Sequence, residues 1–143
     1  MEKNQEGCDK VPTVAISGGF DPIHPGHVRL IHDSALYGDV VVILNNDQWL
    51  KRKKGFVFLD WLSRAYILRA IKGVSKVIGV DDNDGTVCKA LEELKPNFFA
   101  NGGDRTAENT PEKELCEKLG IVMLWNIGGE KIASSSELVN AVK

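Results

Sequence analysis

Short β-branched, apolar runs alternate along the chain with longer segments of helical periodicity, and this alternation constrains the fold most. Five of these runs predict buried strands, over residues 13–17, 39–44, 76–80, 97–101 and 122–127. The segments between them predict helices over about 26–37, 60–72, 86–94 and 111–119, with a last helix near 135–142. Strands that are apolar along nearly their whole length belong to a sheet covered on both faces. The pattern therefore predicts an α/β fold with a parallel, doubly wound sheet.

Helix-end residues agree with this assignment and define one unit. Pro25 suits a first helical turn, and Gly38, Gly73 and Gly120 suit helix C-termini. The sequence contains no internal repeat and no linker-like tract. We expect one domain over residues 11–143, preceded by a flexible N-terminal segment over residues 1–10. Its expected architecture is a Rossmann-like sheet of about five parallel strands with helices on both faces.

Composition excludes several classes of function. Of the 143 residues, 43% are hydrophobic and 27% are charged, which is typical of a globular chain. The net charge of −2 offers no basic excess for binding nucleic acid, and no apolar run is long enough to span a membrane. The first ten residues lack the apolar core of a signal peptide, so we expect a cytoplasmic protein. Cys8, Cys88 and Cys116 form no CxxC pair, so we expect reduced thiols.

Four polar clusters each follow a predicted strand. They are "GGFDPIHPGH" (18–27), "NNDQWLKRKKG" (45–55), "GGDR" (102–105) and "GGEKIASSS" (128–136). Ligands of open α/β sheets bind beyond the carboxyl ends of the strands, near the point where the strand order reverses. The four clusters are therefore expected on one rim of the sheet, where they form a single site.

The first cluster has the chemistry of a polyphosphate site. At Gly18 and Gly19, where the first strand ends, we expect positive φ and close approach of a ligand. Gly26 enters a helix whose first N–H groups lack intrahelical partners and attract anions. His24 and His27 add two side-chain donors at the same place. Together these groups suit a polyphosphate.

Three other interpretations compete for the same cluster. His24 and His27 lie three residues apart and could bind a metal, but His24 precedes a proline, which disfavours helical geometry there. Each histidine could also be an ordinary surface or capping residue. A dinucleotide-binding fingerprint with Asp47 as the ribose-binding acid is the third alternative, yet "GGFDPI" does not fit GxGxxG.

The stretch "GGFDPIHPGHVRLI" (18–31) resembles the signature GxFDxxHxGHxxxL of the cytidylyltransferase-like nucleotidyltransferase superfamily. The resemblance covers nearly the whole chain from residue 13 on. This group includes glycerol-3-phosphate cytidylyltransferases and heptose-1-phosphate adenylyltransferase domains. The resemblance implies that His24 and His27 are catalytic and contact the nucleotide phosphates, and that Asp21 organises the loop. The residues expected to bind the nucleotide here are Gly18, Gly19, Phe20 and Gly26.

The basic run "LKRKKG" (50–55) lies between the second strand and the next helix, where a solvated basic loop is the ordinary interpretation. The family has a lysine just before a glycine here, which implies that Lys54 is catalytic and binds phosphate. Lys51 is the reserve candidate for binding substrate. Arg52 and Lys53 are expected in solvent.

The next helix contains "WLSRAYIL" (61–68), which resembles the family's ExR pattern. Arg64 matches the arginine, which implies a contact with substrate. Leu62 stands where the family has glutamate, so the usual partner of that arginine is missing.

The two remaining clusters supply further candidates. "NGGDR" (101–105) resembles a GGD element of the family. The resemblance implies that Gly103 and Asp104 bind the nucleotide and that Arg105 binds the phosphate of the second substrate. A plain turn is the alternative. The run "ASSS" suits phosphate binding by Ser134 and Ser135. Either serine could instead be a helix N-cap, and Lys131 stands near the position of a family arginine.

The implied reaction moves a nucleoside monophosphate from CTP, or from ATP, to a phosphorylated small molecule such as a sugar or polyol phosphate, and releases pyrophosphate. The GGD element and the serine run resemble the cytidylyltransferase and heptose-phosphate branches of the family, which favours CTP slightly. The attacking phosphate oxygen is already an anion, so no general base is needed. We expect magnesium (Mg²⁺) to arrive with the triphosphate and not at a protein metal site. A non-catalytic nucleotide-binding regulator and a nicotinamide-dependent oxidoreductase are the alternatives.

Many members of this family are dimers. The aromatic residues between the second strand and the next helix could form a homodimer interface, or they could pack in the core. They are Trp49, Phe56, Phe58 and Trp61.

Overall fold

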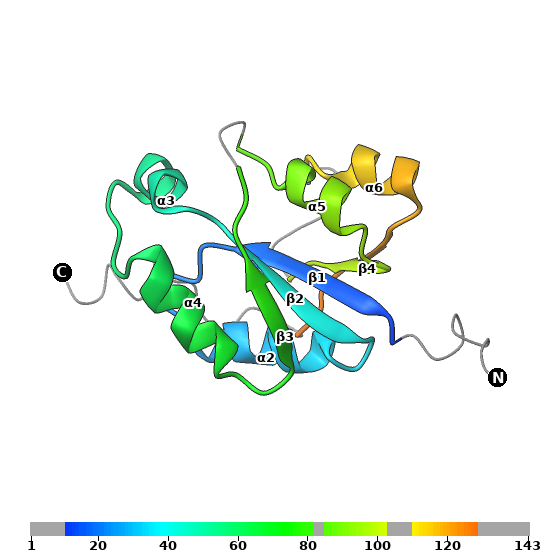
Figure 1. Ribbon diagram of the computed structural model, residues 1–143, viewed down its shortest axis with the longest axis horizontal. Coiled ribbons are helices and arrows are strands. Elements are labelled where there is room, and N and C mark those ends of the chain that lie inside the picture. The colour runs from blue at the N-terminus through cyan, green and yellow to red at the C-terminus, as the bar shows by residue number, and fades with distance from the viewer. Residues whose placement is uncertain (1–10, 82–84, 103–109, 129–143) are drawn as a thin grey trace.

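The computed structural model describes residues 11–81, 85–102 and 110–128. Five parallel strands form one sheet in the order β3-β2-β1-β4-β5 (Figure 1). The strands are β1 (Thr13–Gly18), β2 (Asp39–Leu44), β3 (Val74–Ile78), β4 (Phe98–Ala100) and β5 (Val122–Leu124). The helices are α2 (Pro25–Ser34), α3 (Asp47–Lys54), α4 (Trp61–Arg69), α5 (Cys88–Leu94) and α6 (Lys113–Leu119). The predicted Rossmann-like α/β fold is confirmed.

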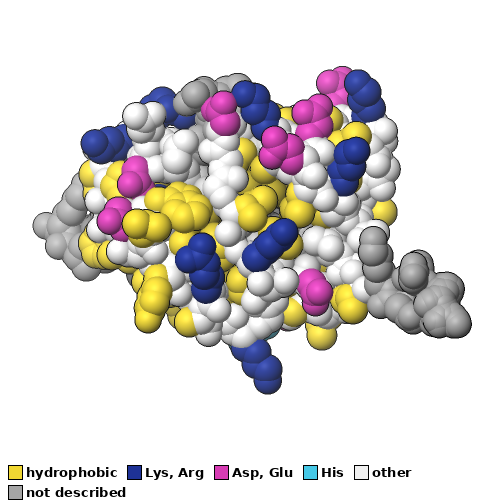
Figure 2. Space-filling model, in the orientation of Figure 1, with side chains coloured by type: hydrophobic (Ala, Val, Ile, Leu, Met, Phe, Trp, Pro, Cys, Tyr) yellow, Lys and Arg dark blue, Asp and Glu magenta, His cyan; other side chains and the backbone are white. Residues whose placement is uncertain are grey.

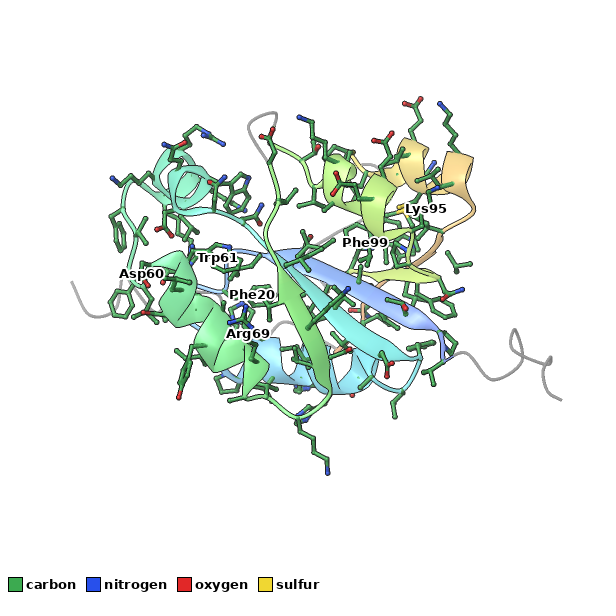
Figure 3. The ribbon with its side chains drawn as sticks, viewed as in Figure 1. Phe20, Asp60, Trp61, Arg69, Lys95 and Phe99 are labelled. Carbon is green, nitrogen blue, oxygen red and sulfur yellow. The ribbon has the colours of Figure 1, made fainter. Side chains whose placement is uncertain are left out.

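Helices cover both faces of the sheet because the strands are apolar on both sides. One core cluster joins alternate residues of the central strands, such as Val14 and Ile16, to α2 and α4. The other joins Ala15 and its neighbours to α5 and α6. Figure 3 shows the two sides, with Phe20 and Trp61 toward α4 and Phe99 toward α5. This is the doubly wound arrangement that the uniformly apolar strands predict.

The strand order reverses between β1 and β4. From β1 the chain moves outward to β2 and β3 on one side, and later to β4 and β5 on the other. In open α/β sheets, ligands bind outside the carboxyl ends of the two strands at such a point. Residues 19–24 leave the sheet here after β1, and Asn101 and Gly102 leave it after β4. The fold therefore brings the first polar cluster to the same edge as Asn101 and Gly102.

The segment after β2 differs from the prediction. We expected an irregular basic loop, and the structure has the helix α3 instead. Asn46 caps its N-terminus through a 2.7 Å hydrogen bond from the Trp49 N–H to the Asn46 side-chain oxygen. Gly55 ends the helix in the left-handed conformation, with φ 90°, and donates its N–H to the Lys51 carbonyl. An N-cap asparagine and a terminal glycine are both signals of a helix. The prediction of a loop is therefore wrong, and the sequence itself contained the evidence for a helix.

Other element boundaries shift by a few residues. The last predicted strand ends at Leu124 and not at 127, because Asn126 takes a left-handed conformation with φ 57°. The third strand begins at Val74, two residues earlier than predicted. The helix predicted near 135–142 lies outside the described residues. Among the helices in the described part of the chain, none is long and apolar enough to cross a membrane.

Candidate functional site

His24 and His27 form a closed pair at the start of α2. His24 is the N-cap of the helix, and its Nδ1 accepts a 3.1 Å hydrogen bond from the Gly26 N–H. In return, Nδ1 of His27 accepts a 3.2 Å hydrogen bond from the His24 backbone N–H. The two rings stack with centroids 3.8 Å apart and planes 22° from parallel. This reciprocal arrangement has the geometry of a capping box, with imidazoles in place of the usual side chains.

The reciprocal bonds fix which ring nitrogens carry protons. A ring nitrogen that accepts a hydrogen bond from a backbone N–H has its lone pair there and no proton. Both Nδ1 atoms are acceptors, so the proton of each neutral ring lies on Nε2. The Nε2–H groups of His24 and His27 therefore lie side by side, on rings whose Nδ1 atoms are held by backbone N–H groups.

His27 stays neutral over the physiological range. Burial of the ring lowers the pKa of His27 from 6.5 to about 3, and a positive charge on His24 or Lys54 acts in the same direction. The ring also meets Phe20 edge to face, with centroids 4.8 Å apart. A neutral, packed imidazole suits a fixed hydrogen-bond donor and does not suit a proton carrier.

The first N–H groups of α2 are less open than the sequence predicts. The Gly26 N–H bonds to His24 Nδ1, and the His27 N–H bonds to the His24 carbonyl at 2.9 Å. The expectation that these amides are unpaired is therefore wrong, because the capping pair satisfies them. The contact of Gly26 with the nucleotide stays a prediction. The donors that this turn presents are the two Nε2–H groups.

The glycines after β1 serve a purpose different from the one expected. Gly18 is extended, with φ 159°, and Gly19 has no positive φ; the left-handed residue is Phe20, with φ 50°. A Cβ on Gly19 would lie 2.6 Å from Cδ2 of Leu50 in α3, and one on Gly18 would lie 3.2 Å from the Phe20 ring. These glycines permit close packing of α3 and Phe20 against the strand end. Their contacts with a nucleotide stay predictions.

Asp21 organises the loop, as the resemblance implies. Its carboxylate accepts hydrogen bonds from the Phe58 N–H at 2.6 Å and the Leu59 N–H at 2.7 Å. The carbonyl of Asp21 accepts a 2.7 Å bond from Lys54 Nζ. One buried aspartate thus ties the turn after β1 to the segment before α4 and to the last residue of α3.

Lys54, the last residue of α3, bonds to the turn that precedes the histidines, and its charge lowers the pKa of His27. Burial is the main cause that lowers the pKa of Lys54 below its ordinary value, with Asp21 opposing and Lys53 and Arg64 adding to the effect. Lys51 is exposed, and the Lys53 ammonium lies 4.7 Å from the centre of the Trp49 ring. The geometry favours Lys54 over Lys51 as the phosphate-binding lysine, and both contacts stay predictions.

Arg64 is buried among protein acceptors. Its side chain is 0% exposed, and Nη2 pairs with Asp47 at 2.5 Å. Nε donates to the Leu59 carbonyl at 2.9 Å, and Nη1 donates to the carbonyls of Gly19 and Asn45 at 2.8 and 2.9 Å. The Asp47 carboxylate thus faces Arg64, which disfavours the ribose-binding alternative. Sequence reasoning did not find this cluster, because carbonyl acceptors have no residue signature.

Several predicted residues lie outside the described residues. They are Gly103, Asp104, Arg105, Lys131, Ser134 and Ser135. At the edge of that region, Asn101 is buried after β4 and donates its side-chain N–H₂ to the carbonyls of Phe99 and Leu124. Asn101 therefore fastens the start of the third polar cluster to β5, a role that sequence reasoning did not assign.

No metal-binding cluster is found among the described residues, where no three His, Cys, Asp or Glu side chains could hold an ion. Asp21, the carboxylate nearest the histidine pair in sequence, uses both oxygens for backbone N–H groups. The donor set at the turn is thus suited to phosphate and not to a cation. Magnesium that accompanies a triphosphate would be held by the phosphate oxygens.

The aromatic residues around α3 and α4 divide between core and surface. Trp61 packs against the core and donates its ring N–H to the Leu44 carbonyl at 3.1 Å. Trp49 and Phe56 are partly buried, and Phe58 is exposed. Core packing thus accounts for Trp61, and the homodimer stays a prediction.

Known proteins resemble this chain in sequence over about three quarters of its length. The bifunctional protein HldE of Geobacter metallireducens is 36% identical over 110 residues, which are 75% of this chain and 22% of that protein. The FAD synthase of Archaeoglobus profundus is 33% identical over 106 residues, 74% of this chain and 65% of that protein. The chain thus spans about a fifth of the length of the HldE proteins that it matches.

A solved structure, that of the lipopolysaccharide core biosynthesis protein from Thermoplasma volcanium, has the same fold. It superposes with a TM-score of 0.71 at 24% identity and covers 85% of this chain and all of its own. The family model described as cytidylyltransferase-like matches residues 15–140, which include both histidines and every polar cluster predicted on the rim. The chain therefore belongs to the cytidylyltransferase-like family.

Proposed function

We propose that this chain transfers a nucleoside monophosphate from a nucleoside triphosphate to a phosphorylated small molecule and releases pyrophosphate. The observation that carries the proposal is the pair of Nε2–H donors on His24 and His27, fixed by reciprocal backbone hydrogen bonds at the strand-order reversal. Membership of the cytidylyltransferase-like family supports the same reaction class.

The chemistry needs charge stabilisation and alignment, and no proton transfer. An oxygen of the acceptor's phosphate forms a bond to the α-phosphorus, and the bond from that phosphorus to the bridging oxygen of the β-phosphate breaks. Negative charge grows on the α-phosphate oxygens and on the departing pyrophosphate. Donors fixed beforehand stabilise such charge without reorganising. The neutral His27 ring and its partner His24 fit this role.

Lys54 is the proposed second contact with the triphosphate. Its ammonium donates a hydrogen bond to the carbonyl of Asp21, the residue that follows Phe20. The charge of Lys54 also lowers the pKa of His27. Half-burial strengthens the attraction between its charge and a phosphate. The substrate is the magnesium complex of the triphosphate, in which the phosphate oxygens hold the ion.

We propose ATP as the nucleotide donor. The GGD element and the serine run favour CTP slightly from the sequence, but those residues lie outside the described part of the chain. The FAD synthase relative, whose product contains an adenine nucleotide, supports ATP. Because this relative is named for the synthesis of FAD, flavin mononucleotide is one acceptor to test beside sugar and polyol phosphates.

A substrate screen tests the proposal. Each of the four ribonucleoside triphosphates is incubated with magnesium and each of a panel of sugar, polyol and flavin phosphates, and pyrophosphate release is measured. We expect release that requires both substrates and is fastest with ATP. Binding of a triphosphate without pyrophosphate release from any pair would favour the non-catalytic regulator. Fastest release with CTP would reverse the choice of nucleotide and leave the reaction class intact.

A homodimer is a further proposal for the same fold. Leu62 and Tyr66 lie one turn apart in α4 and are 72% and 78% exposed, and Phe58, just before the helix, is 53% exposed. Figure 2 shows hydrophobic side chains on the surface over α4. Light scattering on the wild type and on Leu62→Asp tests the homodimer. We expect a dimeric wild type and a monomeric variant, and a monomeric wild type would contradict the proposal.

A further inference from the structure

Arg64 lies where the two central strands stop pairing. The β1–β2 register runs to Gly18 opposite Leu44, and the Asn45 N–H then bonds to the Gly18 carbonyl at 3.0 Å. Beyond that point, Nη1 of Arg64 donates hydrogen bonds to both the Gly19 and the Asn45 carbonyls. One nitrogen therefore joins the two chain segments after their ladder ends.

The bond to Gly19 sets the orientation of the next amide. A trans peptide unit is planar, and its C=O and N–H point in opposite directions. The Gly19 carbonyl points at Arg64, so the Phe20 N–H points away from it. Within the described residues that N–H has no hydrogen-bond partner. Phe20 itself is held by its ring contact with His27, at 4.8 Å between centroids.

The same guanidinium reaches the loop that Asp21 holds. Arg64 Nε donates to the Leu59 carbonyl at 2.9 Å, and the Leu59 N–H donates to the Asp21 carboxylate at 2.7 Å. Leu59 is thus held from both sides, by a cation and by an anion. Asp21 in turn positions Lys54 through its carbonyl. Arg64 and Asp21 thus join three segments: the turn over residues 19–24, the end of α3 at Lys54 and the segment before α4 that contains Leu59.

The charge of Arg64 is balanced inside the protein. Asp47 is its carboxylate partner at 2.5 Å, and its other three recorded bonds end on carbonyl oxygens. Four of its five N–H groups are thereby used, and the side chain is 0% exposed. A substrate phosphate would have to break these bonds to reach it.

We propose that Arg64 is a positioning residue for nucleotidyl transfer, which orients the Phe20 amide and the histidine turn by holding the Gly19 and Asn45 carbonyls and does not touch substrate. The inference rests on the proposed function for its kinetic part and on these hydrogen bonds for its structural part. It replaces the substrate contact that the family resemblance implies for this arginine.

The test compares Arg64→Lys and Arg64→Met with two controls. Asp47→Asn weakens the ion pair and leaves the carbonyl acceptors in place, and Arg69→Met removes an exposed arginine from the same helix. Hydrogen exchange of the unliganded proteins is measured first, since it needs no substrate. We expect exchange in residues 19–24 to rise about tenfold or more in both Arg64 variants, with α5 and α6 unchanged.

Kinetics with the pair that the screen identifies give the second measurement. For Arg64→Lys we expect kcat to fall about 10²-fold, because misplacement of the phosphate donors by about 1 Å has that effect. The KM for each substrate is expected to stay within about threefold. Arg69→Met is expected to keep kcat within about threefold, and Asp47→Asn is expected to lower kcat less than Arg64→Lys does, because the carbonyl bonds remain. A raised acceptor KM with unchanged kcat would show a substrate contact and overturn the proposal.

Two further outcomes contradict the inference. Unchanged exchange in residues 19–24, or an equal rise over α5 and α6, would show that Arg64 does not act locally on the turn. If Arg64→Met fails to fold, Arg64→Lys and a crystal structure of the wild type with ATP and magnesium provide the test. Arg64 bonded to the Gly19 and Asn45 carbonyls in that crystal supports the inference. Arg64 bonded to a phosphate overturns it. If no pair releases pyrophosphate, the proposed function fails, and the exchange result still tests the structural part.

Discussion

Nδ1 of His27 accepts a hydrogen bond from the backbone N–H of His24, 3.2 Å away, while Nδ1 of His24 caps the helix that carries His27. The spacing of three residues makes this possible, because the N-cap and the third residue of a helix lie next to each other. The two imidazoles are thereby fixed in one tautomer before any ligand arrives. Capping and phosphate recognition use opposite nitrogens of the same rings, so the two can be separated by mutation.

The variant His24→Asn separates helix capping from phosphate recognition. Asparagine keeps an N-cap acceptor but lacks the Nε2–H, so we expect unchanged thermal stability within about 0.5 kcal/mol and a kcat lower by about 10²- to 10³-fold. His24→Ala should lose the same activity and also about 1 kcal/mol of stability. His32→Ala, at an exposed position in the last turn of the same helix, is the control. Near-normal pyrophosphate release by His24→Asn contradicts the role of Nε2.

Protonation of His27 is expected to control stability in mild acid. The folded pKa is about 3 against 6.5 for the free side chain. The unfolded chain therefore binds a proton below pH 6.5 that the folded chain does not bind until about pH 3. Stability is fully present above pH 6.5 and falls with decreasing pH, by up to about 1.4 kcal/mol per pH unit.

Denaturant unfolding of the wild type and of His27→Gln between pH 4.5 and 6.5 measures this effect. The difference between the two proteins should shrink as the pH falls, because only the wild type carries the depressed imidazole. Asp60 does not interfere, since hydrogen bonds from Ser63 hold the pKa of its carboxyl below 3.8, outside this window. A constant difference across the window would mean that His27 is not buried as a neutral ring.

Lys54 and Lys51 should differ in function. We expect Lys54→Ala to lower kcat/KM for the triphosphate by about 10²-fold, because its half-buried ammonium lies beside the histidine pair. Lys51→Ala removes an exposed charge of the same helix and should change kcat/KM by less than about threefold. Steady-state kinetics decide between them. A larger loss in Lys51→Ala would exchange the two assignments.

Gly19→Ala tests the packing of α3 against the end of β1. The added Cβ would lie 2.6 Å from Leu50 Cδ2, so we expect a loss of about 1–3 kcal/mol in the free energy of unfolding. Leu50→Ala removes the obstructing atoms, and in that background the cost of Gly19→Ala should fall. Gly55→Ala meets no atom within 4 Å and serves as the comparison for left-handed strain alone. Additive losses in the double variant would contradict the clash.

The sheet and the histidine turn could be predicted from the sequence because their signals are local. Uniformly apolar strands such as β2 predict a two-sided sheet, and the glycine-rich turn before a helix indicates the edge at which we propose that phosphate binds. The helix α3 was not predicted because its residues were interpreted by their charge, and the capping residues Asn46 and Gly55 were not considered. Capping decides the boundary, whereas charge decides only which side faces water.

The environment of Arg64 could not be predicted in the same way. Three of its four recorded partners are backbone carbonyls, at Gly19, Asn45 and Leu59, and any residue type can supply a carbonyl. Only the arrangement of strand ends and loops in space brings them together. The occupied amides of Gly26 and His27 were missed for a related reason, because imidazole is an unusual N-cap.

The most direct test is nitrogen-15 NMR of the histidine rings at pH 7, before and after addition of ATP and magnesium. The proposed mechanism predicts that His24 and His27 are both neutral with the proton on Nε2, and that ATP shifts both Nε2 signals while His32 stays unchanged. A proton on Nδ1 of either ring, or Nε2 signals that ignore ATP at saturating concentration, would contradict it.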